Sequence, residues 1–177
     1  FGLVLGIKSP LLAIQLLWIN LVTDSLPAIA LGLEKEEENI MSRLPRNPKK
    51  NLFADGLWWK IMIEGAMLEM FTLLAFSIGN RLYSVEVGRT MAFLTLGILE
   101  LVHSFNIKSE ESIFKIGIFE NKYLIGALVL GVILQVIVVV VSPLAQVFSL
   151  VPLTGIQWLY TILIAVAPIP IVEIQKA

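Results

Sequence analysis

Long apolar stretches alternate with short polar connectors along the whole chain. Five stretches are each long enough, at about 1.5 Å per helical residue, to cross about 30 Å of hydrocarbon. They cover residues 10–33, 57–79, 87–106, 123–141 and 154–173. The pattern therefore predicts an all-α fold, a polytopic transmembrane bundle of five spans. Residues 1–7, FGLVLGI, are predicted to be the tail of a preceding helix.

Composition strengthens this interpretation. Of the 177 residues, 57% are hydrophobic and 15% are charged, and the mean hydropathy is +0.86. A soluble domain carries more charge than this. The chain has no cysteine, which excludes disulfides and thiolate metal sites, and its single histidine, His103, excludes a histidine-rich metal cluster. We expect the lipid bilayer, and no nucleic acid, as a partner.

The basic residues predict an orientation. Connector 34–56 with the adjoining Lys60, and connector 107–122, together hold nine of the thirteen lysines and arginines. Under the positive-inside rule these two loops and the C-terminus are cytoplasmic. The connectors 80–86 and 142–153 are then on the opposite side of the membrane.

Polar residues interrupt the first apolar stretch. Asn20, Thr23 and Asp24 stand at positions i, i+3 and i+4, so a regular helix presents an amide oxygen, a hydroxyl and a carboxylate on one face. Pro27 lacks an N–H, and its ring clashes with the carbonyl of Thr23, four residues earlier. We therefore expect the helix to kink or unwind between Thr23 and Pro27 and to leave carbonyl oxygens free.

Hard cations prefer this set of oxygen ligands, and broken helices hold such ions in many transporters. Glu100, in the third stretch, is expected to complete the site if its helix is a neighbour of the first. The alternative is that Asp24 is hydrogen-bonded to a neighbouring helix with no ion involved. His103 is expected to be a hydrogen-bonding neighbour of this site, and Glu64 to be reached by water.

The segments 15-QLLWINLVTDSLPAIALGLE-34 and 40-IMSRLPRNPKKNLF-53 carry a resemblance to a known family. They are similar to the sixth membrane helix and following cytoplasmic loop of P-type calcium-transporting ATPases, of the bacterial and sarco/endoplasmic-reticulum types. The resemblance implies that residues 1–7 end helix five and that the five spans are helices six to ten. It also implies that the calcium ligands are Asn20, Thr23, Asp24 and Glu100.

The family's phosphorylation motif DKTG and its TGES loop do not occur in residues 1–177, nor does a Gly-rich phosphate loop. We therefore interpret the chain as the C-terminal transmembrane domain of a pump, without a catalytic site of its own. The resemblance implies Ca²⁺ as transported ion, with ATP and Mg²⁺ used by the parent protein. It also implies partners upstream: the actuator, phosphorylation and nucleotide-binding domains and the remaining membrane helices.

Three functions stay open from the sequence. The first is the cation-binding part of an ATP-driven calcium pump in a bacterial plasma membrane. The second is the same architecture with manganese or sodium as the transported ion. The third is a secondary transporter or channel, which the absence of a visible internal repeat disfavours.

Overall fold

The computed structural model describes residues 10–33, 57–107 and 121–175, and in these ranges all regular structure is helical. The prediction of an all-α bundle is confirmed. In chain order the elements are α1 (Ala13–Ile19), the π-helix η1 (Asn20–Asp24), α2 (Ser25–Gly32), α3 (Leu57–Leu82), α4 (Val85–Ile107), α6 (Lys122–Val140), α7 (Ser142–Val147), α8 (Gly155–Val166) and α9 (Pro168–Gln175).

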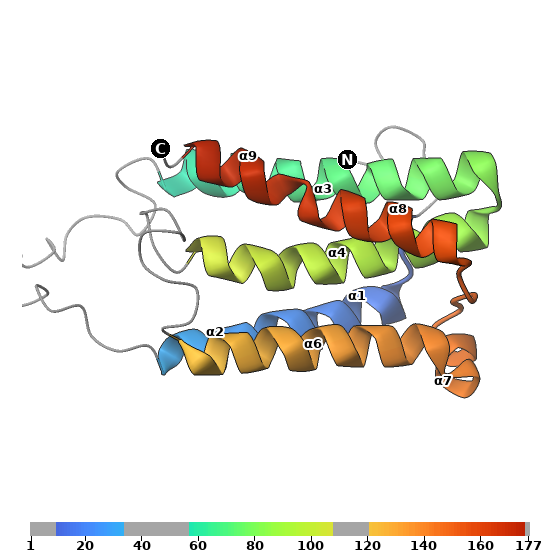
Figure 1. The fold of residues 1–177 in the computed structure, drawn as a ribbon, viewed down its shortest axis with the longest axis horizontal. Helices are drawn as coiled ribbons and strands as arrows, with labels where there is room; N and C mark the ends of the chain where they lie inside the picture. Colours follow the sequence, from blue (N-terminus) through green and yellow to red (C-terminus); the bar gives the residue numbers. More distant parts are fainter. Residues whose placement is uncertain (1–9, 34–56, 108–120, 176–177) are drawn as a thin grey trace, which may run out of the picture.

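The helices run side by side along one axis (Figure 1). The rod formed by α1, η1 and α2 lies against α6, and α9 continues the direction of α8. We call one end of the bundle the α7 end, which also holds the start of α1 and the turn between α3 and α4. The other, the α2 end, holds the end of α2 and the starts of α3 and α6.

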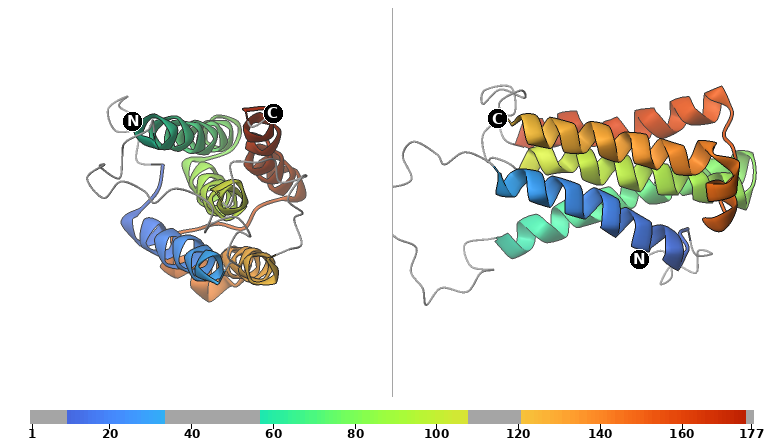
Figure 2. Two further views of the ribbon diagram at one scale, coloured as in Figure 1. Left: turned by 90° about the vertical axis from the view of Figure 1, so that its left-hand side faces the viewer. Right: turned by 90° about the horizontal axis from the view of Figure 1, so that it is seen from below.

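Helix α4 is the innermost helix (Figure 2). It contacts α1, η1, α3, α6, α8 and α9. Its middle, from Thr90 to Thr95, is buried without interruption, whereas α3, α6 and α8 each keep an exposed apolar face. The other helices therefore assemble around α4.

Within the described ranges, four helical segments are long and apolar enough to cross a membrane: Ala13–Gly32, Leu57–Leu82, Lys122–Val140 and Gly155–Val172. Helix α4, which corresponds to the predicted span 87–106, is not among them, so the structure gives four such segments where the sequence predicted five. Its buried face is more polar than that of a lipid-facing helix, because it includes Thr90, Thr95, His103 and Ser104. A helix enclosed by others can carry such residues, since the bundle supplies their partners.

The connectors differ in how far the structure describes them. Residues 142–153 include the short helix α7, and Ser149 follows it with a positive φ of 52°. The Val151 N–H donates to Thr90 Oγ1 (3.0 Å), which ties this connector to α4. Residues 1–7 and loop 34–56 lie outside the described residues, as does most of loop 107–122.

The backbones of α3 and α4 approach closely at the α7 end. A Cβ built on Gly79 would stand 2.5 Å from the Gly88 Cα, so neither position has room for a side chain. Small residues at an interface let two membrane helices pack backbone to backbone. This contact fixes how α3 is rotated and placed against α4.

Gly79→Ala is therefore expected to lower the free energy of unfolding by about 1–3 kcal/mol, because the added methyl forces two backbones apart. Thermal unfolding of the full-length protein in detergent measures it. The matched control is Gly126→Ala in α6, where a Cβ would meet nothing within 4 Å. That variant is expected to be as stable as the wild type or slightly more so. Equal stability of the two alanine variants would contradict the close approach.

Candidate cation site

The first membrane helix changes its winding at the predicted break. Residues Asn20–Asp24 form a π-helix between α1 and α2. The helix was expected to kink or unwind between Thr23 and Pro27; the chain does not unwind, and the distortion is a π-helix that lies just before Pro27. In a π-helix each N–H bonds to the carbonyl five residues earlier instead of four. Pro27, which cannot donate to the Thr23 carbonyl, stands three residues after the end of this π-helix, and the chain stays helical through it.

Thr23 is the buried polar residue of the π-helix. Its Oγ1 lies 2.7 Å from the Ile19 carbonyl oxygen and 2.5 Å from Glu100 Oε2. A hydroxyl carries one hydrogen and donates to one acceptor at a time. The Thr23 hydroxyl can therefore donate to the Ile19 carbonyl or to the Glu100 carboxylate, and both acceptors lie within reach of its hydrogen. The structure thus joins η1 to α4 through one hydrogen-bonded pair.

The other two predicted ligands face outward. Asn20 and Asp24 are exposed on the side of η1 that the described residues do not cover. Asp24 is nevertheless close enough to Glu100 for two negative charges to repel each other. The wider π turn places Thr23 on a different side from Asn20 and Asp24, so the prediction that all three share one face holds only for a regular α-helix.

The donor set is that of a hard cation. Asp24 and Glu100 offer carboxylates, Thr23 a hydroxyl and Asn20 an amide oxygen, and Ca²⁺ takes six to eight such oxygens. Within the described ranges there is no group of three or more His, Cys, Asp or Glu residues that could hold a metal. Two carboxylates and two neutral oxygens fit a dication in charge but supply fewer ligands than it needs.

A second pair of ionisable side chains lies between α3 and α4. His103 Nε2 is 3.4 Å from Glu64 Oε2, and the two side chains are only 10% and 19% exposed. The sequence predicts that water reaches Glu64 and that His103 is a hydrogen-bonding neighbour of the candidate site. The structure instead directs His103 toward Glu64. Sequence reasoning missed this pair, because it depends on how α3 is rotated against α4.

Gln135 makes the interhelical hydrogen bonds typical of an amide inside a bundle. Its Nε2 donates to the Phe93 carbonyl of α4 (2.9 Å), and its Oε1 accepts from Trp18 Nε1 of α1 (3.2 Å). Trp18 was not singled out from the sequence, although it stands two residues before Asn20. The only signal would have been its indole N–H, which needs a partner when it is buried.

A helical bundle with apolar outer faces and paired polar side chains inside it is the structure of a multi-pass membrane protein with an internal polar site. The comparison with protein families also indicates a membrane protein, and it identifies the family. The family model described as "Cation transporting ATPase, C-terminus" matches residues 8–177. The chain belongs to this family.

Curated relatives agree along the whole chain. A calcium-transporting ATPase of Bacillus subtilis is 39% identical over 95% of this chain and 19% of its own length. Calcium-transporting ATPase 1 of Bacillus cereus is 36% identical over 99% of this chain and 22% of its own length. A calcium-transporting ATPase of Listeria monocytogenes is 37% identical, over 99% and 20%. The chain thus spans about a fifth of the length of these relatives.

Pro27→Ala tests the origin of the π-helix. The alanine restores an N–H and removes the ring, so residues 20–24 are expected to return toward a regular α-helix and to shift Thr23 relative to Glu100. Cation affinity of the full-length protein, measured by isotope binding, is expected to fall about tenfold, the cost of losing roughly one well-placed ligand contact.

The matched control is Pro170→Ala, because Pro170 is the third residue of α9 as Pro27 is of α2. It is exposed and lies in a different helix from Thr23 and Glu100, and its replacement is expected to leave affinity unchanged. Unaltered affinity in Pro27→Ala would show that the proline does not shape the site.

Proposed function

We propose that this chain is the cation-binding part of the membrane domain of an ATP-driven P-type pump that moves Ca²⁺. The observation that carries the proposal is the buried contact between Thr23 of η1 and Glu100 of α4, beside the Asp24 carboxylate. Two helices far apart in the sequence bring hard oxygen donors to one point. The names of the relatives favour calcium among the hard cations.

Binding would proceed by replacing hydrogen bonds with ion contacts. A dication entering between η1 and α4 would replace the hydrogen bond that Thr23 donates to Glu100, and both oxygens would then contact the ion. Asp24 would add a second negative charge, which a hard dication requires. Glu100 and Thr23 would thus exchange their mutual hydrogen bond for contacts with the ion.

The uncovered face of η1 is where the remaining ligands would enter. Asn20, Asp24 and the large apolar side chains Leu17, Leu21 and Ile29 are exposed there. In a full-length pump the upstream membrane helices would pack on this face and add oxygens to those of Asn20 and Asp24. The same helices would shield both polar side chains from lipid. A charged side chain at the centre of a membrane helix costs roughly 2.5–3.5 kcal/mol of insertion free energy.

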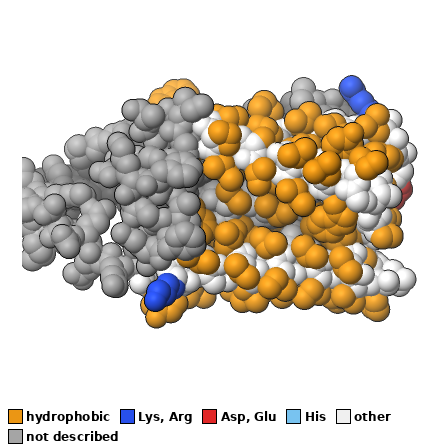
Figure 3. Space-filling view, viewed as in Figure 1, with side chains coloured by type: hydrophobic (Ala, Val, Ile, Leu, Met, Phe, Trp, Pro, Cys, Tyr) orange, Lys and Arg blue, Asp and Glu red, His pale blue; other side chains and the backbone are white. Residues whose placement is uncertain are grey.

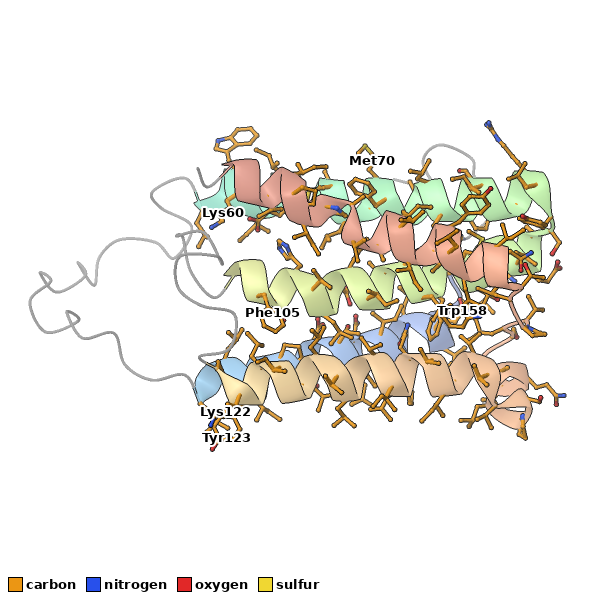
Figure 4. The ribbon with its side chains drawn as sticks, viewed as in Figure 1. Lys60, Met70, Phe105, Lys122, Tyr123 and Trp158 are labelled. Atoms are coloured by element: carbon orange, nitrogen blue, oxygen red, sulfur yellow. The ribbon has the colours of Figure 1, made fainter. Side chains whose placement is uncertain are left out.

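The surface supports the proposed orientation. The visible face is mostly hydrophobic along its length, and charged side chains appear near its ends (Figure 3). Lys60 and Lys122 both lie at the α2 end (Figure 4), where loops 34–56 and 107–122 are attached. This end would face the cytoplasm of a bacterial cell. Loop 34–56 would then meet the phosphorylation domain, which uses ATP and Mg²⁺ outside this chain.

The central test is Asp24→Asn in the full-length pump. The substitution keeps size and polarity but removes a negative charge, so calcium-dependent phosphorylation from ATP is expected to be lost at calcium levels that saturate the wild type. Phosphorylation from inorganic phosphate is expected to survive, because that chemistry lies in another domain. Radioactive phosphoenzyme formation measures both.

Glu100→Gln is expected to raise the half-saturating calcium less than Asp24→Asn does, since it removes one ligand charge and keeps an oxygen. Wild-type calcium dependence in Asp24→Asn would refute the proposed site. Competition identifies the ion: if manganese or sodium, and not calcium, supports phosphorylation of the wild type, the alternative cation is the transported one.

Orientation can be tested with single cysteines, because the chain has none of its own. In a cysteine-free full-length protein, Lys50→Cys in loop 34–56 is expected to react with an impermeant maleimide only from the cytoplasmic side. The control is Gln146→Cys, on an exposed position of α7, which is expected to react only from outside. The reverse pattern would invert the proposed topology.

A further inference from the structure

Gln135 is a fully buried amide in the middle of α6, at 0% exposure. It uses both ends of its side chain, since Nε2 donates to the Phe93 carbonyl of α4 and Oε1 accepts from the Trp18 indole of α1. Three helices therefore meet at one side chain. Burying an amide in an apolar bundle is unfavourable unless its hydrogen bonds are made, so the three helices are held in one arrangement.

Helix α4 leaves room for this side chain. A Cβ built on Gly97 would come within 2.7 Å of Gln135 Cδ, so any larger residue at position 97 would push the amide away. Trp18 is fixed from its other side as well, because its ring packs edge-on against Phe148 with centroids 5.3 Å apart. The donor and the acceptor of the amide are both held in place.

The residues of α1 and α4 that Gln135 contacts lie close in sequence to the residues of the candidate cation site. Trp18 lies two residues before Asn20, where the π-helix begins, and Gly97 lies three residues before Glu100. The segments that Gln135 ties together are thus the ones that continue into Thr23 and Glu100. Thr23 lies five residues after Trp18, and Glu100 lies seven residues after Phe93, the two residues that Gln135 bonds. A change in the spacing of α1 and α4 at Gln135 would therefore be passed along both helices to those two side chains.

We propose that Gln135 is a positioning residue for the cation site, a role that rests on the proposed function. It does not touch the ion. It holds α1 against α4 at the distance at which Thr23 and Glu100 face each other, so that the ion meets oxygens already in place. Ligands that must be brought together at the moment of binding reduce affinity, whereas preorganised ligands do not.

Gln135→Met in the full-length pump tests the proposal, because methionine matches the length of the side chain but makes neither hydrogen bond. The half-saturating calcium for phosphorylation from ATP is expected to rise about tenfold, as for the loss of one buried hydrogen-bonded tie. Phosphorylation from inorganic phosphate is expected to be unchanged. Trp18→Phe keeps a ring against Phe148 and removes only the N–H, so it is expected to give a smaller rise in the same direction.

The matched control is Gln15→Met. Gln15 is also fully buried, and its Nε2 donates to the Phe148 carbonyl (2.8 Å), but it lies near the start of α1, further from Thr23. Its replacement is expected to lower thermal stability as much as Gln135→Met does, with calcium dependence unchanged. A purely structural role of Gln135 would give the same pattern for both variants.

A double-mutant cycle tests whether Gly97 acts through Gln135. Gly97→Ala alone is expected to raise the half-saturating calcium, because the new methyl displaces the amide. In a Gln135→Ala background the space is empty, and Gly97→Ala is expected to add little. Additive effects would mean that the two residues act independently.

The outcomes separate this proposal from the proposed function. If the wild-type pump shows no calcium dependence, the proposed function fails. If it does, and Gln135→Met and Trp18→Phe both retain the wild-type half-saturating calcium, the positioning role is wrong while the cation site stands. If Gln135→Met does not fold, Trp18→Phe alone decides between a positioning role and none.

Discussion

A polar group inside an apolar bundle must find its partner within the protein, and this constraint determines how the inner faces of these helices meet. Water and lipid cannot replace a missing partner at that depth. The ties run from the α7 end to the α2 end, and each joins residues far apart in the sequence. They are Gln15 with the Phe148 carbonyl, Gln135 with Trp18 and Phe93, Thr23 with Glu100, His103 with Glu64, and Asn121 with the Ala30 carbonyl. Apolar packing brings the helices together, and these ties select one arrangement.

Helix α4 takes part in three of those ties, which explains its central place. Its partners in these ties lie on η1, α3 and α6, and the helix meets them with the Glu100 carboxyl, the His103 imidazole and the Phe93 carbonyl. Two glycines add to this, Gly88 by its close approach to the backbone of α3 and Gly97 by leaving space for the Gln135 side chain. A helix with polar groups on several sides cannot face lipid, so the remaining helices enclose it. The site residue Glu100 is consequently held by the most constrained element of the described fold.

Hydropathy predicted the helices well. Each apolar residue favours lipid or the protein interior and each charged residue favours water, so the pattern along the chain is enough to locate the helices. In the candidate site, the contact between Thr23 and Glu100 brings the two predicted helices together, but the ligand roles of the four residues stay a prediction. Pro27 signalled a disturbance in the helix, but the 3.6-residue period could not reveal that a π-helix would absorb it and direct Thr23 inward, away from Asn20. The pairing of Glu64 with His103 was missed because it depends on the rotation of α3, which the contact between Gly79 and Gly88 sets. The local pattern of apolar and polar residues does not predict such contacts between residues far apart in the sequence.

The π-helix lies between two fixed points of the first rod. Gln15 ties the start of α1 to Phe148, and Asn121 donates to the Ala30 carbonyl near the end of α2, at 3.1 Å. A rod held at both ends cannot slide or tilt freely, so a change at its centre must be absorbed locally. A π turn suits this, since its hydrogen bonds can shift between the fourth and the fifth residue while the chain stays helical. The replacement of the contact between Thr23 and Glu100 by a cation would therefore change the winding of η1 while α1 and α2 keep their places.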